Sequence, residues 1–327
     1  MKITLLSGGT GTPKLLDGLC SLSNPPEISI VVNTGDDLEI SGNLVCPDLD
    51  SVLYTCAGII DFDYWYGIKD DTYQTHERIK NLSETSTKSA YFPPQKQSRS
   101  HPLSRNRRFS GRQEFMRIGD QDRATHITRT SLLEEGMNLE QVTDSMAKSM
   151  NIQEQVLPMS NDPVSTFILT DDGPMHFQEF WIDRNGKPRV ETIEYKGIDS
   201  ARAPDSVFDA LESAVVIGPS NPVTSIGPIL SLPGIKQALK QTTVLMVSPF
   251  VNDRVFSGPA GEFLEAMDYQ ASTAGVIDYY GSILDHVVLD PSDRTTAECE
   301  VHHMNTRMDT LSERKTLATE LLRIVLD

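Results

Sequence analysis

The chain of 327 residues is 38% hydrophobic and 23% charged, an ordinary globular composition that supplies a large buried core. Its formal net charge of −17 argues against nucleic acid as a partner, because a polyanion requires a basic face. No apolar run approaches the ~20 residues of a membrane span and no signal peptide is visible, so we expect a cytoplasmic protein with no membrane partner.

The first predicted element is a buried strand over Ile3–Leu6, which ends at a glycine-rich turn. A helical pattern follows over Lys14–Leu22, with Pro13 expected at the first helical position. Strand, glycine turn and helix predict an anion site, because glycine lets N–H groups approach closely and the helix N-terminus adds partial positive charge. The turn matches neither a P-loop nor the dinucleotide-binding glycine pattern. A tight turn without a ligand is the alternative.

A second buried strand over Ile28–Asn33 completes a strand–helix–strand unit. The loop that follows, Asn33–Asp37, is therefore expected beside the glycine turn at the carboxyl edge of a parallel sheet. Asp36 and Asp37 suit Mg²⁺, which takes one or two carboxylates together with substrate phosphates. A turn or helix cap is the alternative for this pair.

An acidic segment, Pro47–Asp50, precedes an apolar helix predicted over Val52–Ile60. Asp48 and Asp50 either extend the acidic cluster or hydrogen-bond a polar substrate, and Asp50 alternatively caps the helix. A further helix is expected to end near Lys80.

The segment Ser83–Ser110 differs from the acidic chain around it. It holds seven serines, three prolines, six Lys or Arg residues and one acidic residue. This composition predicts a flexible insertion, which we interpret as a solvated loop, with contact to an anionic partner as the alternative.

Two helices are predicted over Arg123–Glu135 and Leu139–Met150. Arg123 offers the donor fork that binds phosphate, and His126 lies on the same helical face. A structural role is the commoner one for a single histidine.

A strand over Val164–Leu169 comes before two alternating segments, Met175–Ile182 and Pro188–Tyr195. The Asn-Gly pair between the two segments predicts a hairpin, expected at the edge of the main sheet.

Alternation of helix and strand then returns. The predicted elements are a helix over Ser206–Glu212, strands over Ala214–Ile217, Val244–Val247 and His286–Leu289, and a helix over Leu311–Leu326. We therefore predict one domain over residues 1–327, with an α/β, Rossmann-like doubly wound fold: a mainly parallel sheet, helices on both faces and a small antiparallel addition. Residues 83–110 form the insertion and residues 164–196 the addition.

Ser220, Asn221 and Ser225 directly follow one of these predicted strands. Small hydroxyls and an amide at the carboxyl edge suit phosphate or base recognition, and a plain turn is the alternative.

Five stretches together resemble one family, the LPPG:Fo 2-phospho-L-lactate transferases of coenzyme F420 biosynthesis. In chain order they are LLSGGTGTPKLLDGL from Leu5, VVNTGDDLEISGNLVCPDLDS from Val31, GDQDRATH from Gly119, HFQEFW from His176 and GPSNPVTSIGPIL from Gly218. Each stretch alone is weak, but the set spans nearly the whole chain and is highly specific.

The resemblance implies a Mg²⁺-dependent transfer without redox chemistry. Fo, a deazaflavin with a ribityl tail, attacks the β-phosphate of lactyl-2-diphospho-5′-guanosine; GMP leaves and phospholactyl-Fo forms. Asp37, with Asp36, would bind Mg²⁺ and draw the proton from the ribityl hydroxyl. The donor would be held by Gly9, Thr10, Gly11, Thr12, Lys14, Asn33, Ser220, Asn221 and Ser225. Fo would contact Asp50, Trp65, Arg117 and Asp120. The family likeness also implies a homodimer.

One departure and three rival functions stay open. The family pattern would run from Leu82 directly to Gly111, so the insertion covers the site, mediates a contact or is inert. The rivals are a sugar-nucleotide-binding regulator of the same fold, a nucleotide-dependent kinase, and a transferase that uses an enolpyruvyl or phosphoglyceryl donor. The missing P-loop argues against the kinase, and the GDQDRATH stretch favours the transferase over the regulator.

Overall fold

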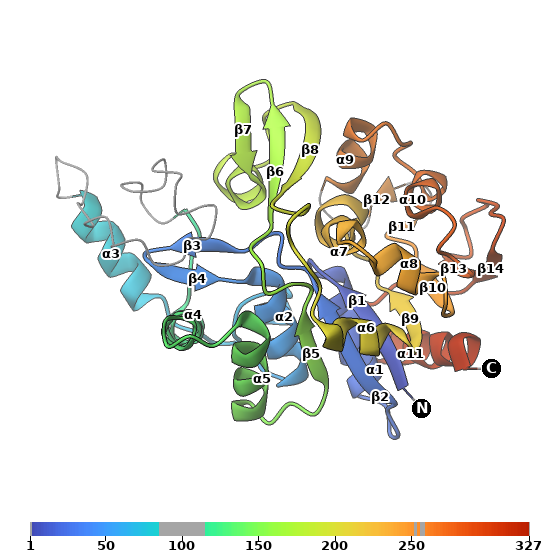
Figure 1. Ribbon diagram of the computed structural model, residues 1–327, viewed down its shortest axis with the longest axis horizontal. Coiled ribbons are helices and arrows are strands. Elements are labelled where there is room, and N and C mark those ends of the chain that lie inside the picture. Colours follow the sequence, from blue (N-terminus) through green and yellow to red (C-terminus); the bar gives the residue numbers. More distant parts are fainter. Residues whose placement is uncertain (1, 85–114, 252–253, 256–258, 327) are drawn as a thin grey trace.

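The computed structural model describes residues 2–84, 115–251, 254–255 and 259–326 (Figure 1). The predicted insertion over residues 83–110 lies outside the described residues, apart from its first two positions. Within the described ranges, every helix is too short or too polar to cross a bilayer.

A seven-stranded sheet forms the centre of the described chain. All its strand pairs are parallel, and their order is β14-β13-β10-β9-β1-β2-β5. The strands are β1 (Lys2–Ser7), β2 (Glu27–Val32), β5 (Gln155–Pro158), β9 (Ala214–Ile217), β10 (Val244–Val247), β13 (His286–Leu289) and β14 (Glu300–His303). From β1 the chain first adds β2 and β5 on one side of the sheet and then adds β9, β10, β13 and β14 on the other. The switch lies between β1 and β9, and the loops after these two strands therefore meet where doubly wound sheets bind ligands.

Side chains of the sheet alternate between two cores, because both faces are covered. In β1, Leu5 enters one core and Leu6 the other. The Leu5 core is covered by α1 (Gly11–Cys20), α2 (Pro47–Cys56), α5 (Leu139–Ser149) and α11 (Leu311–Leu326). The Leu6 core is covered by α6 (Asp205–Leu211), η3 (Pro222–Ile226), α7 (Gly227–Ser231), α8 (Ile235–Leu239), α9 (Ala260–Ala266) and α10 (Thr273–Tyr280). The predicted doubly wound α/β fold is confirmed.

The described chain also contains three antiparallel pieces, a π-helix and two more α-helices. The helices are α3 (Gln74–Glu84) and α4 (Asp120–Glu134). The antiparallel strands are β3 (Leu38–Ile40) with β4 (Asn43–Val45), β11 (Phe250–Val251) with β12 (Arg254–Val255), and β6 (Ser165–Thr170) with β7 (Gly173–His176) and β8 (Val190–Lys196). In Figure 1 the last three strands form a separate lobe at the top of the view.

The predicted antiparallel addition is present, but its arrangement was predicted wrongly. Both β7 and β8 pair with β6 rather than with each other, and the three strands form their own sheet instead of extending the main one. A π-helix, η2 (Glu179–Asp183), occupies the second half of the segment predicted as the first hairpin strand. Asn185 and Gly186 do adopt the positive φ values of a turn, 53° and 63°, but this turn joins η2 to β8.

Two helices begin earlier than the sequence predicted. α1 starts at Gly11, so Pro13 is its third residue, a position at which the backbone N–H is still unbonded and proline is tolerated. α2 starts at Pro47, the residue type favoured at the first helical position. Asp48 and Asp50 therefore lie in the first turn of α2, and the alternative that Asp50 caps the helix is wrong.

Candidate functional site at the carboxyl edge of the sheet

The glycine turn after β1 is packed closely against its neighbours. The N–H of Gly9 donates to Asp48 Oδ1 at 2.8 Å, which ties the turn to the start of α2. A Cβ at Gly11 would lie 2.0 Å from the carbonyl oxygen of Pro219, so only glycine lets the loop after β9 come this near. Because α1 begins here, the N–H groups of its first turn give this edge partial positive charge.

Of the three residues predicted from the loop after β9, Ser220 and Ser225 lie beside the glycine turn, whereas Asn221 caps η3. Ser220 Oγ donates to the carbonyl oxygen of Gly8 and accepts from the N–H of Thr12 at 3.2 Å. The side-chain oxygen of Asn221 accepts from two N–H groups of η3, at 3.0 and 3.1 Å. Ser225 is buried, and a Cβ on Gly8 would lie 2.7 Å from its Cβ. These residues set the shape of the turn.

Asn33 joins three elements at the end of β2. Its amide nitrogen donates to Asp48 Oδ2 at 2.9 Å and to the carbonyl oxygen of Thr224 at 3.2 Å, while its oxygen accepts from the N–H of Gly35 at 2.8 Å. Asp48 is therefore the shared acceptor between the glycine turn and β2. Burial raises the pKa of Asp48 to about 6, although the bonds from Asn33 and Gly9 favour its charged form.

Asp36 and Asp37 place two carboxylates in the interior of this edge. They are 2% and 3% exposed, and the Oδ1 atom of each is buried without a hydrogen-bond partner among the described residues. Burial raises the pKa of Asp36 well above its usual range, and the carboxylates of Asp48 and Asp37 raise it further. Burial also raises the pKa of Asp37, against the opposing effects of a hydrogen bond with Cys46 and the charge of Arg129. Buried carboxyl groups of this kind either take up a proton or bind a cation, so the pair is compatible with the Mg²⁺ site that the sequence predicted.

Asp50 has its partners on α4. Its carboxylate pairs with both terminal nitrogens of Arg129 and lies 3.2 Å from His126 Nε2, and His126 also lies 3.2 Å from Asp122. Burial disfavours the charged forms of Asp50 and His126, but the hydrogen bonds and opposite charges of their partners outweigh it. These interactions lower the pKa of Asp50 and raise the pKa of His126 to about 9. The sequence reading missed Arg129, which is 1% exposed; the available signal was its spacing of three residues from His126 on one helical face.

Two residues predicted to contact Fo lie where α3 meets α4. The carboxylate of Asp120 accepts from the hydroxyl of Thr72 at 2.5 Å and from the first two N–H groups of α3, each at 3.0 Å. These hydrogen bonds hold the pKa of Asp120 below its usual range. The guanidinium of Arg117 stacks 3.7 Å from the centre of the Tyr73 ring.

Trp65 lies between α1 and α11. Its ring is 6% exposed, with Lys14 Nζ 5.9 Å and the Arg314 guanidinium 5.0 Å from the ring centre. Burial lowers the pKa of Lys14. The structure thus brings Trp65 to Lys14, a residue predicted to hold the donor, and directs the lysine amine toward this ring.

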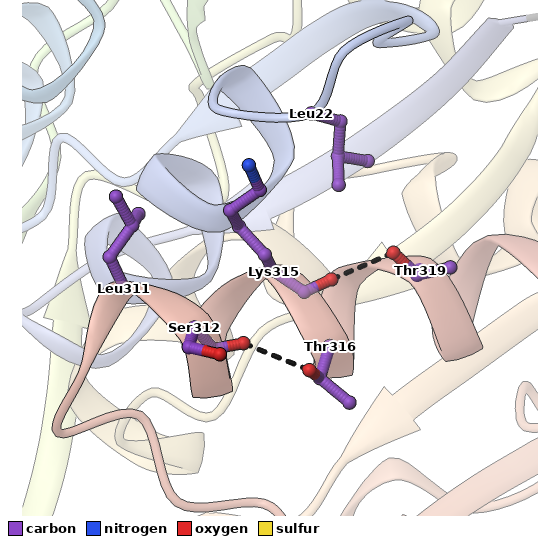
Figure 2. Close-up of a pocket in the computed structure, with 6 residues that line it drawn as sticks. All are labelled: Leu22, Leu311, Ser312, Lys315, Thr316 and Thr319. Atoms are coloured by element: carbon purple, nitrogen blue, oxygen red, sulfur yellow. Dashed lines mark hydrogen bonds between the residues drawn. The ribbon is translucent and has the colours of Figure 1, made fainter.

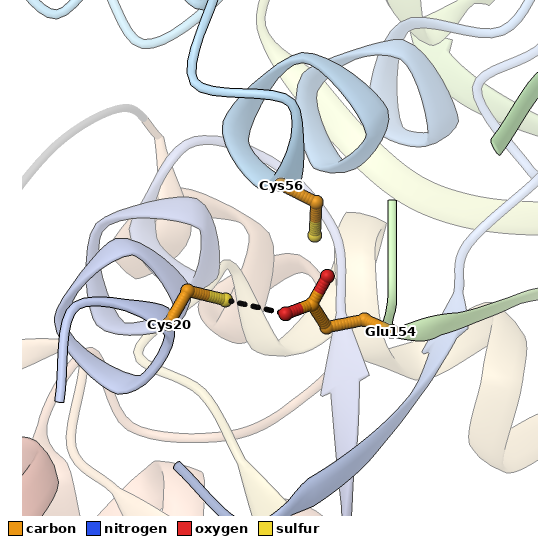
Figure 3. A group of neighbouring side chains, drawn as sticks. All are labelled: Cys20, Cys56 and Glu154. Carbon is orange, nitrogen blue, oxygen red and sulfur yellow. Dashed lines mark hydrogen bonds between the residues drawn. The ribbon is translucent and has the colours of Figure 1, made fainter. Parts of the chain in front are cut away.

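Two further features lie outside the carboxyl edge. Figure 2 shows an open groove along α11, lined by Leu22, Leu311, Ser312, Lys315, Thr316 and Thr319. Figure 3 shows Cys20 and Cys56, the last residues of α1 and α2, beside Glu154, with the Cys20 thiol donating to Glu154 Oε1 at 3.3 Å. Neither feature contains a residue predicted for the site.

Comparisons with known proteins identify relatives of this chain and support its fold. The family model described as 2-phospho-L-lactate transferase CofD matches residues 3–326. Proteins named 2-phospho-L-lactate transferase from Haloarcula marismortui, Halobacterium salinarum and Methanococcoides burtonii are 47%, 45% and 42% identical, over 94%, 96% and 98% of this chain and 94%, 95% and 98% of their own. A crystal structure of a UPF0052 family member from Bacillus halodurans aligns with a TM-score of 0.55 at 17% identity, covering 100% of this chain and 99% of that one, which supports the fold.

Proposed function

We propose a specific reaction for this chain, which belongs to the 2-phospho-L-lactate transferase CofD family. A hydroxyl of the ribityl tail of Fo attacks the phosphorus that bears the lactyl group in lactyl-2-diphospho-5′-guanosine. A new P–O bond forms, the bond from this phosphorus to the bridging oxygen breaks, and GMP leaves with that oxygen. The hydroxyl proton passes to a base on the protein. The products are phospholactyl-Fo and GMP, and the reaction serves coenzyme F420 biosynthesis.

The observation that carries this proposal is the pair of buried aspartates beside the glycine turn. Transfer of a substituted phosphate needs positioning and charge neutralisation more than covalent catalysis by the protein. The unpartnered Oδ1 atoms of Asp36 and Asp37 fit a divalent cation, and these two residues would hold Mg²⁺. When bound, Mg²⁺ supplies positive charge to the diphosphate and to the departing GMP.

One carboxylate of this pair also takes the proton of the ribityl hydroxyl. A general base has a higher pKa than an ordinary exposed carboxylate, and burial raises the pKa of both Asp36 and Asp37. Of the two aspartates, we assign this role to Asp37, as the family resemblance of the stretch from Val31 implies.

The donor's diphosphate would lie on the N-terminus of α1. The first turn of α1 would offer N–H groups at this edge, with the exception of the Thr12 N–H, which donates to Ser220 Oγ. Asn33, Asp48 and Ser220 contribute by holding the turn in place through the hydrogen bonds described above. Fo would approach from the side of α2 and α4 that carries Asp50, Arg117 and Asp120.

The test is an incubation of the purified chain with Fo, Mg²⁺ and lactyl-2-diphospho-5′-guanosine, followed by mass spectrometry. We expect phospholactyl-Fo and GMP in equal amounts. Parallel reactions with enolpyruvyl- and 3-phosphoglyceryl-diphosphoguanosine identify the preferred donor, because their products differ in mass. No product with any donor, together with no quenching of Fo fluorescence, would overturn the proposal. Light scattering of the same sample tests the expected homodimer.

A further inference from the structure

We infer that His286, Glu300 and His302 form a binding site for one divalent transition-metal ion of the zinc class. These residues stand on β13 and on β14, the edge strand of the main sheet. His286 and Glu300 are the first residues of their strands and are paired in register. The cluster therefore lies at the amino edge of the sheet, at the opposite end of the strands from the proposed transfer site.

The strand geometry brings all three side chains to one face. Glu300 and His302 are two residues apart on β14, the spacing that places side chains on the same side of a strand. His286 adjoins them from β13, because the parallel register sets it opposite Glu300. Two neighbouring strands thus present three ligand side chains to a single point.

The donor atoms are already spaced as a metal requires. His286 Nδ1 lies 3.2 Å from His302 Nε2, and Glu300 places one carboxylate oxygen 3.5 Å from the first nitrogen and the other 3.8 Å from the second. A tetrahedral zinc ion with bonds of ~2.0–2.1 Å separates its ligand atoms by roughly 3.3 Å. The side chains therefore need little movement to share one ion.

The donor set selects the class of ion. Two imidazole nitrogens and one carboxylate suit zinc, cobalt or nickel, whereas Mg²⁺ prefers oxygen ligands alone. The histidine side chains are 20% and 21% exposed and that of Glu300 is 66% exposed, so an ion can enter from solvent and water can complete its coordination.

Binding here would join the edge strand to its neighbour. β14 has four residues and, among the described strands, pairs only with β13, so a shared ion adds a cross-strand link at the end where both strands begin. An ion that binds only the folded protein raises the melting temperature by mass action. We assign the site a structural role that does not depend on the proposed transfer reaction.

The test is a Co²⁺ titration of tag-free protein in saturating Mg²⁺, read by visible absorption and by metal content after dialysis. The matched variants are His302→Ala and His303→Ala; His303 is the next residue of β14, on the alternate face, and its Nδ1 lies 3.4 Å from the carbonyl oxygen of Asp290. We expect one Co²⁺ per chain in the parent and in His303→Ala, and at least a tenfold weaker affinity in His302→Ala. We also expect Zn²⁺ to raise the melting temperature by about 2 °C or more, except in His302→Ala.

Three outcomes would overturn the inference. They are absence of bound metal in the parent, equal affinity in His302→Ala, and a near-ultraviolet thiolate charge-transfer band. The last result would place the ion at Cys20 and Cys56 instead. Because the readouts are metal content and spectrum, they stay informative whether or not the chain transfers phospholactate.

Discussion

Asp71 and Asp120 cap each other's helices. Asp71 accepts from the N–H groups of Gln121 and Asp122 at the start of α4, at 3.0 Å each for the shorter contacts, while Asp120 accepts from the first two N–H groups of α3. Carboxylates at helix N-termini satisfy unbonded N–H groups and the partial positive charge together. The reciprocal bonds fix the junction of α3 and α4, which carries Arg117 and Asp120, two of the four residues predicted to contact Fo.

Replacing either cap should loosen the helix that it serves. We expect Asp120→Ala to speed amide hydrogen exchange in the first turn of α3, and Asp71→Ala to do the same in α4, because the N–H groups lose their acceptors. Fo affinity measured on both variants separates capping from contact. Equal losses of Fo affinity in the two variants indicate that both residues act only as caps. A larger loss of Fo affinity in Asp120→Ala indicates the direct contact with Fo that the sequence predicts. Unchanged exchange in both variants would contradict the capping role.

Asp37→Asn should lower turnover by about 100-fold or more and weaken the dependence on Mg²⁺, because it removes a general base and a carboxylate ligand. Steady-state assays over a range of Mg²⁺ concentrations measure both effects. The matched control is Glu39→Gln, since Glu39 is an exposed residue two positions away on β3 and should leave turnover within twofold. Full turnover with unchanged Mg²⁺ dependence in Asp37→Asn would rule out its role.

Arg129→Met should destabilise the fold by about 3–5 kcal/mol, because it leaves Asp50 buried without its main cation. Urea unfolding provides the measurement. The double variant Asp50→Asn with Arg129→Met should recover part of the loss, since no full charge then remains uncompensated at this position. Arg189→Met, at a side chain that is 77% exposed, serves as the control and should change stability little. A similar loss of stability in Arg129→Met and Arg189→Met would argue against a stabilising ion pair between Asp50 and Arg129.

The His126 ion pairs predict a pH dependence of stability. Because the pKa is raised from 6.5 to about 9 in the folded chain, the stabilisation is complete below about pH 6.5 and is lost as the pH rises through about 9. Its size is about 3 kcal/mol from the shift. Unfolding free energies measured from pH 6 to 10 should fall in the parent and much less in His126→Gln. Parallel profiles for the two proteins would refute this prediction.

Mg²⁺ should stabilise the chain more at pH 7.5 than at pH 5. The pKa of Asp48 is raised to about 6, and those of Asp36 and Asp37 are raised as well, so protons hold these carboxylates at low pH and compete with the ion. Without Mg²⁺, raised pKa values make stability decline as the pH increases through about 6. Melting curves with Mg²⁺ and with Ca²⁺ as comparison, at both pH values, measure the effect. An equal shift at both would indicate binding elsewhere.

Local sequence patterns predicted the layers of the fold because the spacing of apolar residues depends on which faces of a strand or helix are buried. Runs of β-branched and apolar residues marked β1, β2, β9, β10 and β13, since strands buried on both faces contain little else. The β3–β4 hairpin was missed, although Ser41 and Gly42, both with positive φ, stand between alternating residues. The segment Met175–Ile182 was predicted as a strand, yet the Phe180 side chain is buried in the core beneath the three-stranded sheet and the backbone winds into a π-helix over Glu179–Asp183.

The candidate site was predictable to the extent that it follows strand ends. Asp36 and Asp37 stand in the loop that follows β2, so topology predicted them at the same edge of the sheet as the glycine turn. The partners of Asp50 and the shared contacts of Asp48 depend on residues far away in sequence, such as Arg129, and no local spacing encodes those pairs. Ser220 was predicted as a ligand because of its position, but whether a hydroxyl faces a ligand or its own loop is decided only by tertiary packing.

The contact between the turn after β1 and the loop after β9 also bears on the order of events during folding. Ser220 reaches back over 212 positions to Gly8, and β1 is bracketed by β2 and β9. During synthesis, a nascent chain can pair β1 with β2 long before β9 leaves the ribosome. At that stage the glycine turn still lacks its contacts with the loop after β9. Acquisition of ligand binding should therefore lag behind most of the secondary structure and would serve as a late marker of completed folding.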